Sequence, residues 1–563
     1  MTRIILGVCV LLSFAAATFA AEKTPTVAGY SFEEALRLGE LMYREGILPS
    51  GEHIEATVQG DIPVNGTMFT CESCHLRSGL GSVEGTIVTL PTNGADLFRD
   101  YSKGSEMVRP MRENFSDQFQ RNLLRPAYTD DSLAEALLLG VDPSGRQLND
   151  IMPEYDLDEK NMEIMVHYLK NLTVKFSPGV DEKTITFATV VTDDVPENRK
   201  KTMYEILDAY VHDKNSQDRY QERRAQEGPF YKLETYTAYR RIDLKKWELH
   251  GDPDTWQSQL KEYYEKDNVF ALIGGLSTKK WKPIHDFCEQ NKIPSLFPIT
   301  DFPVISDSDW YTLYLSKGIY QEGESVARYL RGIKEKKSLK ILQVIREKDM
   351  IGESLSRGFE ETWELLKQSL PENLIVKEGE VIDDTFWKKL SNTHKADIFL
   401  LWLSPVDLRS IGALAGTDGD PRQVFISSTQ QKEAIFALPE SVRDFVYITY
   451  PYELPEDGHI KKLAMKKWLK IRKIENSDMI LQGKLFFLNR ILTGALADMR
   501  RDYYRDRFFE GIDMMIDQYY TAPVHHNMSF GPAQRYASKG CYIVQLDSGD
   551  KPTLIKKSSW VIH

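Results

Sequence analysis

The spacing of hydrophobic and polar positions changes near residue 184. Before that point, two segments have apolar residues at helical spacing. The first holds Leu133, Ala136, Leu137 and Leu138, and the second holds Met162, Met165, Val166 and Leu169. Thr129 or Asp130 can cap the first helix and Gly140 can end it. The pattern predicts helices in this front part of the chain.

After residue 184, short apolar runs of strand type alternate with helical segments. The clearest runs are "TITFATVVT", "NVFALIGG", "IPSLFPIT", "KILQVIRE", "DIFLLWL", "QVFISS" and "DFVYITYPY". This alternation predicts parallel sheets wrapped by helices, with a ligand site outside the carboxyl ends of the strands. About 380 residues exceed a single comfortable core, so we expect two lobes.

The first residues differ from both parts. Arg3 precedes an apolar run from Ile4 to Phe14, and small residues follow. This order predicts a secretory signal peptide over residues 1–21, cut close to Ala20, and therefore a periplasmic protein. The alternative, a membrane anchor, needs about 20 apolar residues, which this run does not reach. We expect no membrane span in the rest of the chain.

Two cysteines and a histidine stand together at Cys71, Cys74 and His75. The sequence Cys-x-x-Cys-His is the pattern of covalent haem c attachment, in which two thiols add to the porphyrin vinyl groups and the histidine binds the iron. A redox dithiol would not need the histidine. A zinc site would need a second pair of ligands. No other closely spaced pair of Cys or His residues in the chain looks like such a pair.

A second axial ligand is expected for such a haem. Met152 precedes Pro153 in an irregular loop, and a thioether is a soft sixth ligand, so we predict Met152. Met162 and Met165 recur on a helical face and are expected in the core. The weaker candidates are Met68, Met107 and Met111, and His53 and His167 for bis-histidine ligation.

"CESCH" together with "GVDPSGRQLNDIMPEYDLDEKNMEIMVHYLKNL" resembles a class I cytochrome c domain, over residues 30–172. The resemblance implies an all-α domain at 22–175 that carries one covalent haem c, with His75 and Met152 as axial ligands. The stretch from Leu80 to Arg125 is then an insertion.

Charge is spread unevenly along the chain. The net charge is −12, and residues 22–175 hold 14 basic and 25 acidic residues, which is 14 − 25 = −11. Nucleic acid is an unsuitable partner for this balance. A periplasmic redox partner, such as a dehydrogenase with a basic face, suits it better. The alternative is that the acidic residues only keep the front domain soluble.

Three later segments resemble the type I periplasmic solute-binding proteins of the branched-chain amino acid group. They are Asp267–Asp301, Leu313–Leu330 and Lys340–Leu366. The resemblance covers residues 184–563 and implies a small-molecule ligand held at Ser277, Thr278 and Thr300, whose hydroxyls and loop amides suit a carboxylate. The alternative is that Ser277 and Thr278 cap a helix that begins near Lys279.

Two departures from this group concern the ligand. Ile351 precedes Gly352 where an aromatic residue is usual, and the polar stretch Ile426–Ala434 offers no clear acidic residue for an amino group. Cys288 and Cys541 form either a disulfide or two buried thiols. His525 and His526 are adjacent and point apart on any regular element, so a joint metal site is not expected.

The sequence therefore predicts a multidomain protein: an all-α cytochrome c domain, a linker at 176–183 and a two-lobed α/β domain at 184–563. The predicted function is a monohaem c-type cytochrome for periplasmic electron transfer with a fused small-molecule-binding domain. The alternatives are the solute-binding receptor of an ABC-type transporter, or a redox or ligand sensor. No catalytic motif is present, so no enzyme is predicted.

Overall fold

The computed structural model describes residues 26–84, 87–102, 124–227, 240–306, 308–333, 339–416, 423–455, 458–499, 502–513, 522–526, 528–530 and 534–562. The chain divides into two compact units, Met1–Val174 (unit 1) and Lys175–His563 (unit 2). The signal peptide predicted over residues 1–21 lies outside the described residues.

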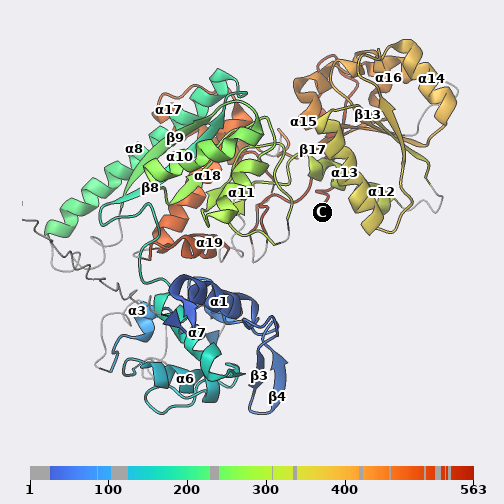
Figure 1. Cartoon of the computed structure of the whole chain (residues 1–563). Coiled ribbons are helices and arrows are strands. Elements are labelled where there is room, and N and C mark those ends of the chain that lie inside the picture. The colour runs from blue at the N-terminus through green and yellow to red at the C-terminus, as the bar shows by residue number, and fades with distance from the viewer. Residues whose placement is uncertain are drawn as a thin grey trace, which may run out of the picture. The chain divides into compact units, whose positions relative to one another are not determined.

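Unit 1 is organised around two helices that pack together, α1 (Phe32–Glu45) and α7 (Glu159–Asn171) (Figure 1). They cross closely because Gly39 has no side chain: a Cβ there would lie 2.4 Å from Cβ of Tyr168. The apolar faces of both helices are buried in one core. The predicted helices of the front part are therefore confirmed.

Unit 1 also contains a sheet, so the prediction of an all-α domain is wrong. Strand β3 (Glu55–Val58) pairs antiparallel with β4 (Ile62–Asn65) and with β7 (Glu154–Asp156). Gln59 and Gly60 both have positive φ, 53° and 84°, which lets the chain turn back between β3 and β4. The remaining elements are β1 (Thr26–Val27), β2 (Tyr30–Ser31), α2 (Cys71–His75), β5 (Val83–Glu84), β6 (Ile87–Val88), α3 (Gly94–Leu97) and α6 (Asp130–Leu139).

The first lobe of unit 2 is built on a five-stranded parallel sheet with strand order β12-β11-β10-β8-β9. Its strands are β8 (Thr184–Thr192), β9 (Arg241–Leu249), β10 (Ala271–Ile273), β11 (Ser295–Leu296) and β12 (Thr312–Leu313). Its helices are α8 (Glu197–Glu227), η2 (Pro253–Thr255), α10 (Trp256–Asp267), α11 (Lys282–Gln290), α17 (His459–Ile471), α18 (Met479–Met499) and α19 (Arg505–Asp513).

The second lobe has a seven-stranded sheet with strand order β14-β13-β15-β16-β17-β18-β19. In this sheet, β18 runs antiparallel to both of its neighbours, β17 and β19. Its strands are β13 (Ile341–Arg346), β14 (Glu372–Val376), β15 (Ile398–Trp402), β16 (Gln423–Ser427), β17 (Val446–Tyr450), β18 (Tyr542–Leu546) and β19 (Leu554–Lys556). Its helices are α12 (Tyr320–Gly332), α13 (Met350–Leu365), α14 (Asp384–His394), η3 (Asp407–Leu414), α15 (Ser428–Gln431), η4 (Lys432–Ala437) and α16 (Glu440–Arg443).

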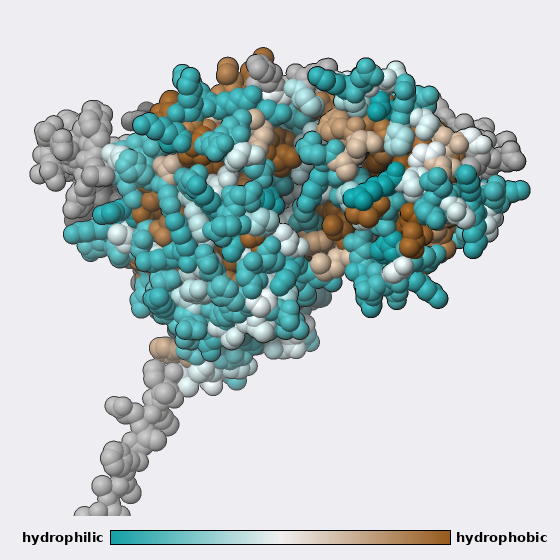
Figure 2. All heavy atoms as spheres, turned by 90° about the horizontal axis from the view of Figure 1, so that it is seen from above, coloured by the Kyte–Doolittle hydropathy of each residue, from teal (hydrophilic) through white to brown (hydrophobic). Residues whose placement is uncertain are grey.

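The surface is mainly hydrophilic on the face that Figure 2 shows, with hydrophobic side chains gathered in smaller patches. Among the residues that the structure describes, no helix is both long and apolar enough to cross a membrane.

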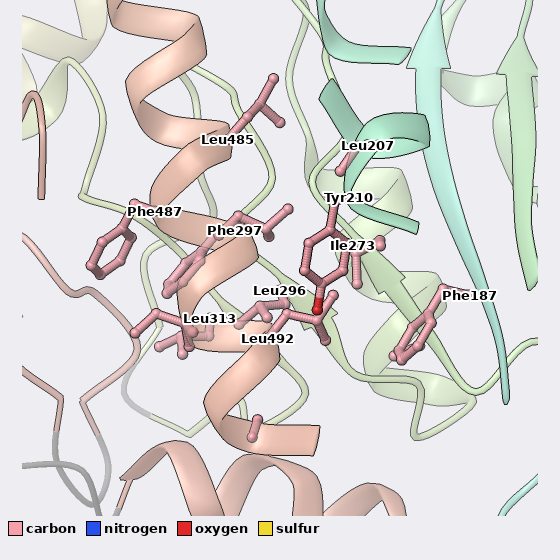
Figure 3. Packing of buried hydrophobic residues seen from close by; sticks show 14 of the residues in the cluster. Phe187, Leu207, Tyr210, Ile273, Leu296, Phe297, Leu313, Leu485, Phe487 and Leu492 are labelled. Carbon is pink, nitrogen blue, oxygen red and sulfur yellow. The ribbon is translucent and has the colours of Figure 1, made fainter. Parts of the chain in front are cut away.

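The core of the first lobe forms where α18 packs on the sheet. Figure 3 shows Leu485 and Leu492 of α18 beside Phe297 and Ile273, on the same side as Tyr210 of α8. All five side chains are 6% exposed or less. The predicted arrangement of parallel sheets wrapped by helices in two lobes is confirmed, since β8 to β12 pair only in parallel and β13 to β17 do the same.

The segment predicted as a linker, residues 176–183, lies against unit 2. The ring of Phe176 meets that of Tyr503 with centroids 6.0 Å apart. A Cβ on Gly179, which has φ +84°, would lie 2.1 Å from the backbone nitrogen of Phe270. These contacts pack the segment against other residues of unit 2, and its role as a linker stays a prediction.

Candidate ligand-binding site

Loops with polar side chains follow the carboxyl ends of the strands in both lobes of unit 2. In the first lobe, Ser277 and Thr278 follow β10, and Thr300 follows β11. In the second lobe, Thr429 follows β16 and Tyr452 follows β17. Carboxyl ends of parallel strands are where ligands bind in open α/β sheets, so these loops outline the candidate site.

The three predicted ligand contacts already have hydrogen-bond partners, of which two lie in the same loop and the third, Asp194, lies in the loop after β8. The Ser277 hydroxyl accepts a hydrogen bond from the Lys279 N–H at 3.1 Å, and the Thr300 hydroxyl accepts one from the Phe302 N–H at 3.0 Å. Thr278 donates its N–H (2.8 Å) and its hydroxyl to Asp194.

None of these bonds caps α11, because that helix begins only at Lys282. The hydroxyls instead brace the loops that line the strand ends. A role for Ser277, Thr278 and Thr300 in ligand binding stays a prediction.

Glu322 is an acidic residue of the site that the sequence analysis missed. It lies on α12, is 0% exposed and receives a hydrogen bond from the Thr449 hydroxyl. Its Oε1 has no hydrogen-bond partner among the described residues. Burial raises the pKa of the Glu322 carboxyl to about 7, although the hydroxyls of Thr429, Thr449 and Ser427 oppose the shift.

A signal for Glu322 was present in the sequence. Gln321, Glu322, Glu324 and Ser325 are consecutive or nearly consecutive polar residues, and all four are buried on α12. Polar side chains on a buried helix need hydrogen-bond partners. Such a run therefore indicates either polar contacts within the protein or a binding site.

Lys484 brings a positive charge to the same region from α18. It is half-buried, and it has no acidic partner within 4.0 Å among the residues that the structure describes. Its Nζ lies 5.5 Å from the centroid of the Tyr452 ring. Burial lowers the pKa of the Lys484 ammonium, and the negative charge of Asp301 partly offsets that effect. No ion pair with a described residue therefore compensates the cost of removing the Lys484 ammonium from water.

The Tyr452 ring beside this ammonium group has further aromatic neighbours. The rings of Tyr450 and Tyr452 meet edge to face at 5.8 Å, and those of Tyr452 and His525 lie 5.6 Å apart. His525 is 2% exposed, and its ring nitrogens make no hydrogen bond to a described residue beyond a weak interaction with the Pro451 carbonyl. Burial and the charge of Lys484 lower the pKa of His525 to about 3, so this imidazole is neutral.

Together these residues form a group that we call the hinge cluster: Asp301, Glu322, Tyr450, Tyr452, Lys484 and His525. In addition to burial, the negative charge of Asp301 raises the pKa of both Glu322 and Tyr452. The positive charge of Lys484 likewise adds to burial in lowering the pKa of His525. The chain passes between the lobes after β12, after β17 and before β18, and Glu322, Tyr452 and His525 lie on or near these passages. It can bind an anionic group at Lys484 and a hydrogen-bond donor at Glu322.

The predicted residues of unit 1 also lie together. Cys71, Cys74 and His75 are on α2, whose first turn the Thr70 hydroxyl caps. Cys71 is buried with its Sγ 3.9 Å from the Tyr155 hydroxyl, and burial raises the pKa of its thiol to about 11. His75 is buried with Nδ1 2.8 Å from the Leu90 carbonyl, and burial lowers its pKa to about 4.

The core positions predicted for Met162 and Met165 are confirmed. Met152 is half-buried against the core of unit 1, and its N–H donates to the Asn149 carbonyl at 2.8 Å. Met162 and Met165 are core residues, 7% and 2% exposed, and Met68 is 73% exposed. Met107 and Met111 lie outside the described residues. Cys288 and Cys541 are both buried free thiols, so they form no disulfide.

Comparison with known proteins finds the fold of unit 2. No family model matches the chain, and no curated protein matches it. A fatty acid ABC transporter substrate-binding protein from Thermomonospora curvata is 18% identical, with 69% of this chain and 95% of that chain covered and a TM-score of 0.45.

Two further solved structures are of the same kind. A solute-binding protein of an ABC transporter from Rhodopseudomonas palustris BisB5, in complex with 3,4-dihydroxybenzoic acid, is 12% identical, covers 68% and 99% of the two chains and has a TM-score of 0.47. A leucine-binding protein from Thermotoga maritima is 11% identical, covers 67% and 98%, and has a TM-score of 0.43. Unit 2 itself is a mixed α/β unit with one sheet in each of its two lobes.

These findings contradict the main predicted function. The solved structures that were found are named as substrate-binding, solute-binding and leucine-binding proteins, and none of the three is named as a cytochrome. The predicted cytochrome c domain is not shown by any comparison, and the predicted redox partner has no support.

The prediction of haem c as a cofactor is corrected together with the predicted function. In the described part of the chain, no group of three or more His, Cys, Asp or Glu side chains could hold a metal ion. The names of the matching proteins give fatty acid, leucine and 3,4-dihydroxybenzoic acid as solutes, and none gives haem.

Proposed function

We propose that unit 2 binds a small solute with a carboxylate group at the hinge cluster, and that the protein serves a membrane transporter as its exported solute receptor. The observation that carries this proposal is Lys484: a half-buried ammonium without an ion-pair partner among the described residues, set against the Tyr452 ring. A buried charge is costly unless it is paired. An unpaired ammonium group beside Tyr452 therefore fits a site in which the ligand supplies the opposite charge.

The neighbours of Lys484 support a ligand with an apolar or aromatic body. Tyr450, Tyr452 and His525 offer ring faces and edges, and ring pairs of this kind favour flat or apolar groups. Glu322 can accept a hydrogen bond from a hydroxyl or amino group, since its Oε1 is without a partner among the described residues. The protein then works as a binding protein and not as an enzyme.

The test is calorimetric titration of the full mature chain with a panel of small carboxylic acids and their methyl esters. An ester keeps the body of the acid and removes its charge. We expect a hit among the acids, no binding of the matching ester, and a loss of at least tenfold in affinity for Lys484→Met.

Lys261→Met is the matched control, because Lys261 lies on α10 with its side chain 73% exposed. It should bind as the wild type does. Equal affinity for acid and ester, or wild-type affinity of the Lys484→Met variant, would overturn the proposal.

A further inference from the structure

A run of basic residues without any acidic one covers helix α17 and the residues just after it. Between His459 and Lys473 the chain holds Lys461, Lys462, Lys466, Lys467, Lys470, Arg472 and Lys473, and neither Asp nor Glu. The chain as a whole has a net charge of −12. This segment is therefore a local reversal of the charge that dominates the molecule.

One face of α17 is part of the core of the first lobe. Met465 and Leu469 are 0% and 2% exposed. Two cations on this side are held by partners: Lys461 Nζ lies 2.7 Å from Glu453, and Arg472 donates to Asp213 and lies over the Trp468 ring. These contacts fix the helix firmly, so the direction of its outer face is defined.

The outer face carries exposed apolar side chains among its lysines. Ile460, Leu463 and Ile471 are 82%, 58% and 66% exposed. Positions 460, 463 and 471 lie on one side of an α-helix, since they are separated by nearly whole turns. Single exposed apolar residues need no explanation, but three on one helix face form a patch.

Unpaired cations border this patch. Lys466, Lys467, Lys470 and Lys473 are exposed, and none has an acidic partner within 4.0 Å among the described residues. Lys466 also acts on its neighbour Lys462, because burial first and then the charge of Lys466 lower the pKa of the Lys462 ammonium. The outer face of α17 thus combines exposed apolar side chains with lysines that have no acidic partner among the described residues.

We propose that the outer face of α17 binds the surface of an anionic phospholipid membrane. An anionic bilayer provides phosphate groups for the lysines and an apolar boundary for Ile460, Leu463 and Ile471, which is the arrangement of a helix that lies in the membrane interface. An acidic protein would match only the lysines. The negative charge elsewhere on the chain would repel the same surface and so turn α17 toward it.

The test is sedimentation of the full mature chain with vesicles of phosphatidylglycerol and phosphatidylcholine, against vesicles of phosphatidylcholine alone, at low and high salt. We expect binding to the anionic vesicles only, and release at high salt because surface charges are screened. The double variant Lys466→Gln/Lys470→Gln should bind roughly 20-fold more weakly, since each lysine near an anionic surface contributes a roughly fivefold effect.

The matched control is Lys388→Gln/Lys389→Gln, an exposed lysine pair on α14. It should keep wild-type binding, while Leu463→Ser should weaken it with the charge unchanged. Far-ultraviolet circular dichroism verifies that each variant is folded.

Two results would overturn the proposal. One is no sedimentation of the wild type with anionic vesicles at low salt, which would leave an acidic protein as the partner of α17. The other is an equal loss for the α17 and α14 variants, which would mean that only the total charge matters.

Discussion

Replacing Glu322 by glutamine tests whether a carboxyl buried at the hinge cluster limits the stability of unit 2. Glutamine keeps the shape of the side chain, and its Oε1 can still accept the hydrogen bond from the Thr449 hydroxyl. Its amide hydrogens would face Ser427 and Thr429, whose hydroxyls can accept them. The substitution therefore removes the charge and little else.

The sign of the effect follows from the raised pKa. Burial moves the pKa of Glu322 from its ordinary value of 4.5 to about 7, so the folded protein binds a proton that the unfolded chain releases. Ionised Glu322 therefore destabilises the fold, and this loss grows as the pH rises from about 4.5 and is complete above about 7.

The magnitude comes from the same two values. One unit of pKa corresponds to about 1.4 kcal/mol, so the full effect at high pH is about 3 kcal/mol. We expect the Glu322→Gln variant to be close to wild type near pH 5 and about 2–3 kcal/mol more stable near pH 8.

The assay is urea unfolding followed by tryptophan fluorescence at a series of pH values. All nine tryptophans lie between Trp247 and Trp560, so the signal reports unit 2 alone in the full chain. Glu265→Gln is the control, because the Glu265 side chain is 66% exposed. If the wild type and the Glu322→Gln variant lost stability equally between pH 5 and pH 8, the reasoning about this buried carboxyl would be wrong.

Two further substitutions test the packing of unit 2 with the same unfolding assay. Gly323→Ala should cost about 2 kcal/mol or more, because its Cβ would lie 2.1 Å from the Leu355 carbonyl where α12 crosses α13. Gly332→Ala, at the end of the same helix, meets nothing within 4 Å and should be neutral or stabilising by up to about 1 kcal/mol. Arg535→Met should cost about 3–5 kcal/mol, because it leaves the Asp513 carboxylate buried without the guanidinium that lies 2.7 Å away.

Each of these has an outcome that would contradict it. Equal stability of the two alanine variants would mean that α12 and α13 can separate at little cost. For the buried ion pair, Arg535→Met/Asp513→Asn should recover part of the loss, because the second change removes the stranded charge. A double variant as unstable as Arg535→Met would assign the loss to packing.

The candidate site shows where reasoning from sequence ends. The loops that carry Ser277, Thr278 and Thr300 could be located because they directly follow apolar strand runs, and their hydroxyls do lie at strand ends. Glu322, Lys484 and His525 were not found, because each comes from a different element and each is separated by at least 40 residues from the others. Spacing along the chain cannot report such a meeting.

The small sheet of unit 1 was missed for a related reason. Strands β3, β4 and β7 have only three or four residues each, too few for an alternating pattern to stand out. Pairing of β3 with β7 joins Glu55 to Asp156 across most of the unit. The helices were found because their apolar faces repeat over several turns.

The sequence by itself determined the class of unit 2, because buried strand runs that alternate with amphipathic helices favour parallel sheets covered by helices. It did not determine the antiparallel pairing of β18 with β17 and β19. Only the tertiary structure decided which polar side chains meet at the hinge cluster, and which face of α17 is left outside the core. Those outcomes depend on how helices far apart in the chain dock, because burial, charge and exposure are properties of neighbours in space and not of neighbours in sequence.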